Sequence, residues 1–117
     1  MASTFADETD LTPERVRQLL DAGEIQLVDV REEYEWEAGR IPGARHIEME
    51  RLASQAETID RERPVVFQCR IGSRAGMAAQ AFRASGYDAH NLVGGIQAWA
   101  DRGLPMEPEG SAYVADH

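Results

Sequence analysis

The amino-acid sequence predicts an α/β fold in which a mainly parallel sheet is flanked by helices on both faces. Short apolar runs of strand length alternate along the chain with segments whose apolar residues recur at helical spacing. The connections between these segments are short and rich in glycine and proline. Strands that alternate with helices in this way pair in parallel, because each helix carries the chain back across one face of the sheet. At 117 residues, the chain is expected to form one domain with a substantial core.

The elements follow one another between two polar ends, residues 1–10 and 107–117, which we expect to be flexible around a domain at 11–106. Thr12-Pro13-Glu14 predicts the start of the first helix, since it supplies an N-cap, a first-turn proline and a first-turn acid, and Gly23 ends that helix. The later elements are expected as strand 25–30, helix 34–38, strand 45–47, helix 51–59, strand 65–68, helix 75–85, strand 89–93 and helix 96–102.

The stretch around which the chain is organised is the central strand, Val65–Gln68, which ends at Cys69 shortly before a helix begins. A tight turn leaves backbone N–H groups without partners and the helix start adds partial positive charge, so an anion is the natural occupant. A cysteine thiolate is such an anion, and Arg70 and Arg74 place two positive charges beside it. A lone cysteine after an apolar strand is more often an inert core residue. Here Gly72 and the two arginines favour a reactive cysteine.

Cysteine and histidine usage limits the chemistry. The chain has a single cysteine, which excludes an internal disulfide, a cysteine-based zinc site and a Cys-x-x-Cys redox pair. The unpaired thiol suits a reducing compartment. The three histidines, His46, His90 and His117, lack metal-ligand spacing, so we expect them at the surface or in the tail. We therefore expect no metal and no cofactor.

The charge balance is strongly acidic. There are 21 acidic and 12 basic residues, for a net charge of -9, which argues against a nucleic-acid partner and against binding to acidic membranes. On such a surface, Arg70 and Arg74 would form a local positive spot for a small anion. The N-terminus has neither the basic segment nor the apolar core of a signal peptide, and no apolar run approaches membrane-spanning length. The expected location is the cytoplasm.

Three separated groups of residues carry a resemblance. They are Asp29-Val30-Arg31-Glu32 with Glu35-Trp36, Gly39 and Ile41-Pro42-Gly43-Ala44; Cys69-Arg70-Ile71-Gly72-Ser73-Arg74; and Leu92-Val93-Gly94-Gly95-Ile96 with Ala98-Trp99 and Gly103-Leu104-Pro105. Together and in this order they resemble the signatures of rhodanese-like domains. The resemblance implies a five-stranded, mainly parallel α/β domain that stands alone. It also implies sulfurtransferase chemistry, in which a donor such as thiosulfate gives its outer sulfur to Cys69 and the persulfide passes to a thiophilic acceptor.

The resemblance also implies roles for individual residues. Cys69 resembles the family nucleophile, and Arg70 resembles the residue that meets the anionic donor. The backbone that resembles the cradle around the sulfur belongs to Arg70, Ile71, Gly72, Ser73 and Arg74. The implied partners are a small anionic sulfur donor and a thiol or cyanide-like acceptor, which includes a small redox or sulfur-carrier protein. Arg40 departs from the family pattern, which commonly has histidine at that place.

Three charged residues of the first group are expected to support the site. Asp29 and Arg31 are better explained as a tie between strand ends than as pocket residues. Glu35 is a candidate partner for Arg74, in which case Arg74 braces the loop and Arg70 alone receives the donor; direct contact between Arg74 and substrate is the alternative.

Four further residues have structural interpretations. Ser73 is expected to cap the following helix rather than to donate to the sulfur. The Gly94-Gly95 pair indicates a backbone requirement and not a phosphate cradle, because no third glycine completes a nucleotide-binding pattern. Trp36 and Trp99 are expected to anchor the core.

Loop length separates the related chemistries. Cysteine-dependent phosphatases place five residues between cysteine and arginine to surround a phosphate, whereas only four separate Cys69 from Arg74. The shorter ring favours sulfur transfer. A second function remains open, namely a sulfur-carrier or docking module loaded by a protein donor. A catalytically silent interaction domain is disfavoured, because the loop retains both its cysteine and its glycine.

Overall fold

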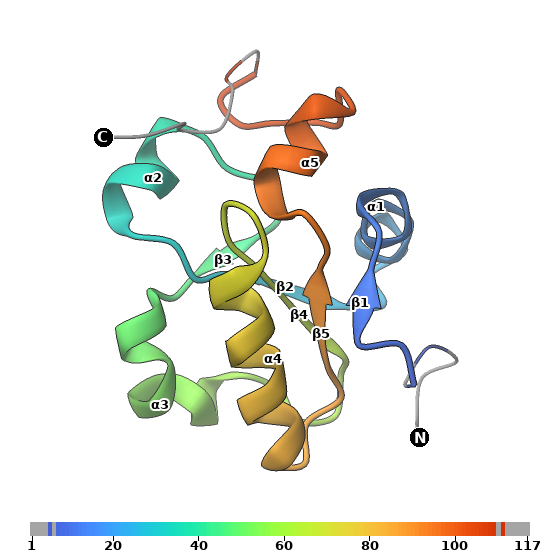
Figure 1. Cartoon of the computed structure of the whole chain (residues 1–117), viewed down its shortest axis with the longest axis vertical. Helices are drawn as coiled ribbons and strands as arrows, with labels where there is room; N and C mark the ends of the chain where they lie inside the picture. Colours follow the sequence, from blue (N-terminus) through green and yellow to red (C-terminus); the bar gives the residue numbers. More distant parts are fainter. Residues whose placement is uncertain (1–4, 6, 110, 112–117) are drawn as a thin grey trace.

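The computed structural model describes residues 5, 7–109 and 111. At its centre is a five-stranded sheet in the order β1-β5-β4-β2-β3, and every pair of neighbouring strands runs parallel (Figure 1). The strands are β1 Asp10–Leu11, β2 Gln26–Asp29, β3 Arg45–His46, β4 Val65–Gln68 and β5 Ala89–Leu92. The expectation of a five-stranded, parallel α/β fold is confirmed.

The helices begin and end close to the predicted places, with one exception. Their bounds are α1 Pro13–Asp21, α2 Glu33–Ala38, α3 Leu52–Gln55, α4 Ser73–Ala84 and α5 Gly95–Asp101. Thr12 caps α1 as predicted, since its hydroxyl accepts a hydrogen bond from the Arg15 N–H at 3.2 Å. The predicted single helix at 51–59 is wrong: α3 is a short helix between two 3₁₀ turns, η1 Met49–Arg51 and η2 Ala56–Thr58.

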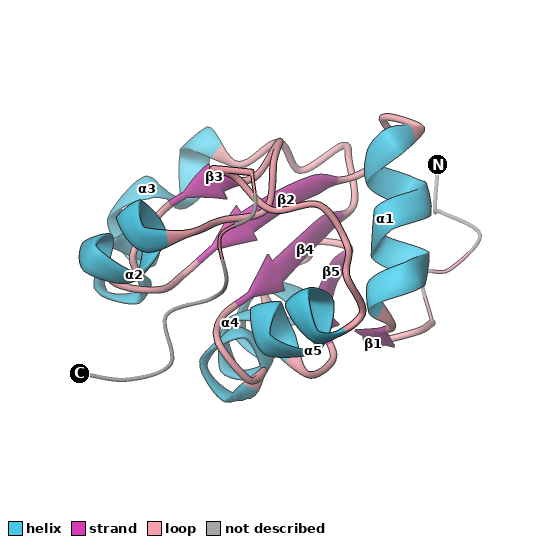
Figure 2. Ribbon diagram, turned by 90° about the horizontal axis from the view of Figure 1, so that it is seen from above, coloured by secondary structure: helices cyan, strands magenta, loops and turns pink. Residues whose placement is uncertain are grey.

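Helices cover both faces of the sheet, as Figure 2 shows. Because side chains alternate along β4, Val65 and Phe67 pack into an apolar cluster with residues of α3 and α4, while Val66 packs into a second cluster with residues of α1 and α5. Like Val65 and Phe67, Cys69 packs on the face of the sheet that α3 and α4 cover. Trp99 of α5 is 1% exposed in the second cluster, so its predicted role as a core anchor is confirmed.

The N-terminal segment contributes more than the sequence suggested. The strand β1 was not predicted, and Phe5, from a segment expected to be flexible, is 2% exposed in the core. The Phe5 ring lies 5.0 Å from that of His90, which is fully buried on β5. One nitrogen of His90 contacts the Asp88 carboxylate at 2.6 Å and the other faces the Glu8 carbonyl. The expectation that His90 lies at the surface is therefore wrong.

The other end of the chain also contacts the domain. Arg40 and Glu107 form an antiparallel bridge through two backbone hydrogen bonds of 2.9 and 2.8 Å, although the sequence placed Glu107 in a flexible tail.

The Arg40 guanidinium lies 5.3 Å over the Trp36 ring, which stacks on half-buried His46 at 4.9 Å. Trp36 is half-buried rather than a full core anchor. His117 and the rest of the expected tail beyond 111 lie outside the described residues.

Candidate active site around Cys69

The loop between β4 and α4 points backbone N–H groups at the Cys69 sulfur. Sγ accepts hydrogen bonds from the Gly72 N–H at 3.1 Å and the Ala75 N–H at 3.4 Å. Gly72 is the N-cap of α4 and has φ +110°, a left-handed conformation that glycine adopts without strain. The two donors and the partial positive charge at the start of α4 all stabilise negative charge on the sulfur. The predicted cradle ended at Arg74 and missed the Ala75 donor.

The start of α5 holds the loop from the other side. The N–H groups of Ile96 and Gln97 donate to the carbonyl oxygens of Cys69 and Arg70 at 2.8 and 3.0 Å. Gly95, with φ +60°, makes this approach possible, because a Cβ at its position would lie 2.4 Å from both carbonyl oxygens. This close approach is the backbone requirement that the paired glycines indicated.

Cys69 itself has no exposed surface. It lies in one apolar cluster with Val30, Phe67 and Ala75. The loop above it is open to solvent at Ile71, whose side chain is 58% exposed, and Arg70 is half-buried. The surroundings of Cys69 are thus not purely apolar, since two N–H groups point at its sulfur.

Arg74 and Glu35 are paired, as the sequence suggested. Arg74 Nη1 and Nη2 lie 3.1 and 3.4 Å from the two carboxylate oxygens of Glu35, which also accepts from the Glu32 N–H at 3.0 Å. Burial disfavours the charged carboxylate, but the hydrogen bonds from Arg74 and Glu32 outweigh it, so the pKa of Glu35 lies below its usual range. The hydrogen bond to Glu35 raises the pKa of Arg74, and the negative charge of Cys69 acts in the same direction.

Asp29 and Arg31 form a second, fully buried pair behind the site. Arg31 Nε lies 3.0 Å from both carboxylate oxygens of Asp29, and Nη2 lies 2.8 Å from one of them. Arg31 Nη2 also donates to the Gly39 carbonyl at 2.7 Å. The pair therefore ties the end of β2 to the end of α2, and not two strand ends to each other as the sequence suggested.

Ser73 lies elsewhere than expected. It is exposed as the first residue of α4, whose N-cap is Gly72, and no side chain caps this helix. The expectation that Ser73 caps α4 is wrong, because the N-cap position is occupied by Gly72, one residue earlier in the sequence.

A shallow cavity of about 370 Å³ opens beside Arg74, where β2 and the η1 turn approach α4. It is lined by Val30, Glu32, Glu48, Met49, Glu50 and Arg74. Within the described ranges, no group of three or more histidine, cysteine or acidic side chains is arranged to hold a metal ion. Nor does any helix there have the length and apolar character needed to cross a bilayer.

Comparison with known proteins places this arrangement in a family. The chain is 31% identical to the thiosulfate sulfurtransferase GlpE of Actinobacillus succinogenes, over 85% of its own length and 90% of the relative's. It is 38% identical to a sulfurtransferase of Allochromatium vinosum, over 80% of its length and 90% of that protein's. Among solved structures, the chain is similar to the human single-domain sulfurtransferase TSTD1, with a TM-score of 0.74 and 32% identity over 80% of this chain and 96% of that one. The sequence profile of the Rhodanese-like domain matches residues 12–102, and the chain belongs to this family.

Proposed function

We propose that the chain is a sulfurtransferase that carries a sulfane sulfur as a persulfide on Cys69. The observation that carries the proposal is the pair of N–H groups, from Gly72 and Ala75, that point at Sγ where α4 begins. An anion on sulfur is the species that such donors stabilise best. The names of the relatives, thiosulfate sulfurtransferase and sulfurtransferase, support thiosulfate as the donor.

The reaction takes two displacement steps at sulfur. The Cys69 thiolate attacks the outer sulfur of thiosulfate, a bond forms between the two sulfurs, and sulfite leaves with the electron pair of the broken S–S bond. An acceptor thiolate or cyanide then attacks the outer sulfur of the persulfide, and the bond to Sγ breaks with its electron pair returning to Cys69. No general base is needed when Cys69 is already ionised.

The residues that follow Cys69 bind the donor and fix the shape of the loop. Arg70, which is half-buried and follows Cys69 in the chain, receives the sulfonate of the donor. Arg74 is held by Glu35 at two points, so it braces the loop and contributes positive charge near the sulfur. Ile71, Gly72 and Ser73 shape the loop through their backbone.

The proposal is tested by intact mass spectrometry after incubation with excess thiosulfate. We expect one added sulfur atom, mapped to Cys69, and turnover of thiosulfate to thiocyanate when cyanide is supplied. Cys69→Ser should abolish both while its circular dichroism spectrum stays unchanged. A folded wild-type protein that remains unmodified in excess donor contradicts the proposal.

A second candidate is a sulfur carrier that is loaded by another protein. The observation that favours it is the complete burial of Cys69, which restricts access for free small molecules. As the only cysteine in the chain, Cys69 has no internal thiol to resolve its persulfide. Fast loading from a cysteine desulfurase, together with slow loading from thiosulfate, would favour the carrier over the enzyme.

A further inference from the structure

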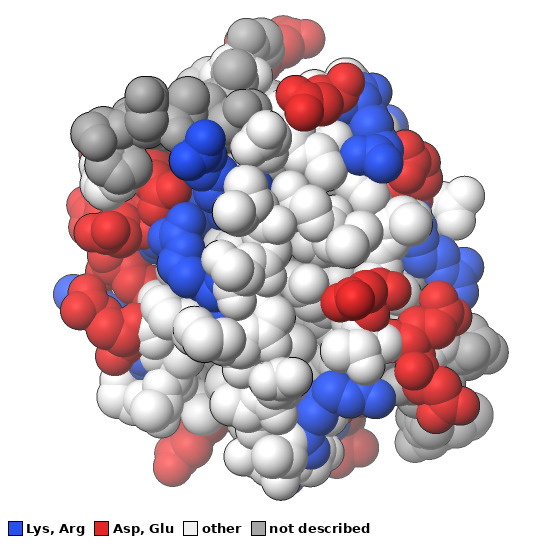
Figure 3. All heavy atoms as spheres, in the orientation of Figure 1, with Lys and Arg blue, Asp and Glu red and all other residues white. Residues whose placement is uncertain are grey.

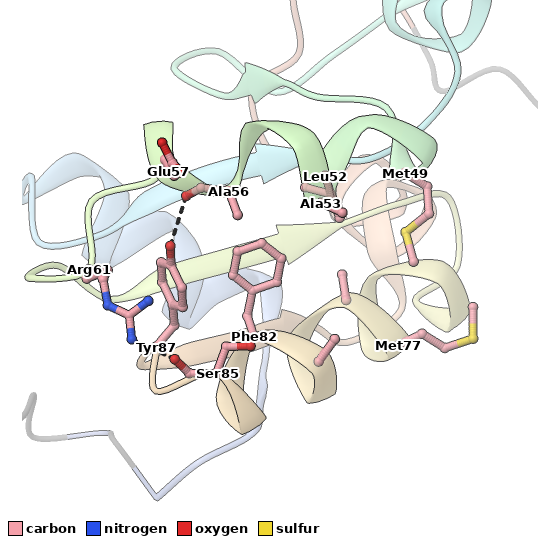
Figure 4. A pocket seen from close by; sticks show the side chains of 12 residues that line it. Met49, Leu52, Ala53, Ala56, Glu57, Arg61, Met77, Phe82, Ser85 and Tyr87 are labelled. Carbon is pink, nitrogen blue, oxygen red and sulfur yellow. Dashed lines mark hydrogen bonds between the residues drawn. The ribbon is translucent and has the colours of Figure 1, made fainter.

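An apolar groove runs along α4, away from the catalytic loop. Its volume is about 550 Å³, and its walls are α4 on one side and the η1-α3-η2 segment on the other (Figure 4). Phe82 and Tyr87 pack edge to face at 4.8 Å near one end, and the Tyr87 hydroxyl donates to the Ala56 carbonyl at 2.8 Å. The residues that line the groove are Met49, Leu52, Ala53, Ala56, Glu57, Arg61, Met77, Ala78, Ala81, Phe82, Ser85 and Tyr87.

The groove adjoins the cavity beside Arg74. Met49 lines both hollows, and Figure 4 shows it opposite Met77 at the other end from Tyr87. The α4 wall is one helical stripe that begins at Arg74, and the next residue, Ala75, donates its N–H to the Cys69 sulfur. The adjoining cavity, rather than the groove itself, therefore reaches Arg74, the residue before the Ala75 amide that contacts the Cys69 sulfur.

The dimensions and surface of the groove suit a helix of another protein. From Arg74 to Ser85 the stripe advances 11 residues, or about 16 Å of helix, which matches three turns of a partner helix lying alongside. Met77 is 59% exposed on this wall, a large apolar side chain that a partner would cover.

The acidic side chains at the two hollows favour a basic partner. Glu57 lines the groove, and Glu32, Glu48 and Glu50 line the adjoining cavity. Figure 3 shows acidic side chains gathered on the side of the molecule around α2, with basic side chains between them and the uncharged surface over α4. Of these four, Glu48 contacts Arg51 at 3.6 Å, while in the described part of the chain no basic side chain pairs with Glu50 or Glu57.

The two arginines that line these hollows are already engaged within the chain. Arg74 pairs with Glu35, and Arg61 donates to the Ser85 carbonyl at 2.6 Å and lies 4.4 Å over the Tyr87 ring. A second copy of this chain is a poor occupant, since each copy carries a net charge of -9.

We propose that the groove binds a basic amphipathic helix of the protein that accepts the sulfur. The apolar face of that helix covers Met77 and Phe82, its lysines or arginines face Glu50 and Glu57, and the acceptor thiol lies at the Arg74 end. The acceptor thiolate then bonds to the outer sulfur of the persulfide while the bond to Cys69 Sγ breaks and returns its electron pair to Sγ. This inference rests on the proposed function, which supplies the persulfide.

Binding is tested first, with the unloaded protein and a synthetic probe. The probe is a fluorescein-labelled peptide of about 14 residues, long enough for three to four turns, with leucines three and four residues apart, lysines on the opposite face and one cysteine near its N-terminus. A matched peptide has glutamate in place of each lysine. Fluorescence anisotropy should detect binding of the lysine peptide and at least tenfold weaker binding, on the order of a 1.4 kcal/mol difference, of the glutamate peptide.

Four variants locate the site. Met77→Glu and the double variant Glu50→Lys with Glu57→Lys should each weaken binding of the lysine peptide by about tenfold or more, since the first buries a charge and the second reverses two attractions. Val93→Glu and Glu24→Lys change an exposed apolar residue and an exposed acid outside the groove, and they should leave the affinity within about twofold. Equal binding of the two peptides, or equal losses in groove and control variants, overturns the proposal. Binding of the glutamate peptide alone would do the same.

Sulfur transfer is measured second, with protein loaded by thiosulfate. The rate of transfer to the lysine peptide, divided by the rate of transfer to cyanide in the same variant, should fall at least about tenfold in Met77→Glu but not in Val93→Glu. An unchanged ratio in Met77→Glu contradicts docking in the groove. If the wild-type protein takes no sulfur from thiosulfate, the proposed function fails, and the anisotropy measurement still decides whether the groove binds a basic helix.

Discussion

Arg74 and Glu35, 39 positions apart in the sequence, form a two-point ion pair that joins the first turn of α4 to α2. Glu35 is buried, so its charge depends on this partner and on the Glu32 N–H. Negative charge on Cys69 would act in the same direction as Glu35 on the pKa of Arg74. The pair therefore links the charge near the sulfur to the position of α2, a helix that contributes no residue to the loop. It is the first target for mutation.

Replacing Glu35 with glutamine should destabilise the protein. Glutamine has the same shape but places an amide against the Arg74 guanidinium, so a buried charged hydrogen bond is lost at a cost of about 2 kcal/mol. Urea denaturation at neutral pH measures this loss. The control is Asp21→Asn, which removes the exposed pair between Asp21 and Arg17 and should change stability by less than about 0.5 kcal/mol. Equal effects of the two substitutions would contradict the importance of burial.

The stability that Glu35 provides should also depend on pH. Because its pKa is lower in the folded protein than in the unfolded chain, the folded state favours the carboxylate, and this contribution is complete above the ordinary carboxylate pKa of about 4. It is lost as the pH falls through the folded-state pKa. The stability difference between wild type and Glu35→Gln should therefore shrink on acidification below about pH 4, as followed by urea denaturation. A difference that grows over this range would contradict the assignment.

Replacing Gly95 with alanine should displace the loop around Cys69. The new Cβ would lie 2.4 Å from the carbonyl oxygens of Cys69 and Arg70, which cannot move without losing their bonds to α5. We expect sulfur loading by thiosulfate to slow at least about tenfold, since a shift of about 1 Å in a reacting group has larger effects. Gly103→Ala is a matched control, because Gly103 has a similar φ of +71° but open space around it. Comparable loading rates in the two variants would disprove the effect.

Replacing Arg70 with alanine should weaken thiosulfate binding. If Arg70 receives the sulfonate, loss of one charged hydrogen-bonding partner should raise KM for thiosulfate about tenfold, with a smaller effect on transfer of the bound sulfur to cyanide. Steady-state kinetics with each substrate varied in turn separates the two effects. Arg102→Ala, on the exposed end of α5, is the control. An unchanged KM would assign donor recognition to other groups.

Local signals in the sequence predicted much of this fold. Thr12 and Pro13 mark the start of α1, and the apolar run at Val65–Gln68 marks the central strand, because in each case adjacent residues determine the structure. The strand β1 has only two residues and exists because Asp10 and Leu11 pair with β5, which no local pattern shows. His90 is buried for a similar reason, since its partners Asp88 and Glu8 replace the water that a histidine usually contacts.

The side chains of the site and its Gly72 backbone donor were predictable, but the second backbone donor was not. Cys69 and its arginines stand out by residue type, whereas the N–H of Ala75 is carried by a residue with no functional side chain. The only available signal was its place in the first turn of a helix, where N–H groups lack helical partners. The contact between α5 and the loop was likewise indicated in the sequence only by the Gly94-Gly95 pair.

These hydrogen bonds from α5 make the position of the loop around Cys69 dependent on that helix. A shortened chain that ends at β5 would keep the cysteine, both arginines and the whole of α4. It would nevertheless leave the carbonyl groups of Cys69 and Arg70 without the Ile96 and Gln97 amides that bind them. The integrity of roughly the last fifth of the chain is thus a condition for the chemistry proposed near the middle of the polypeptide.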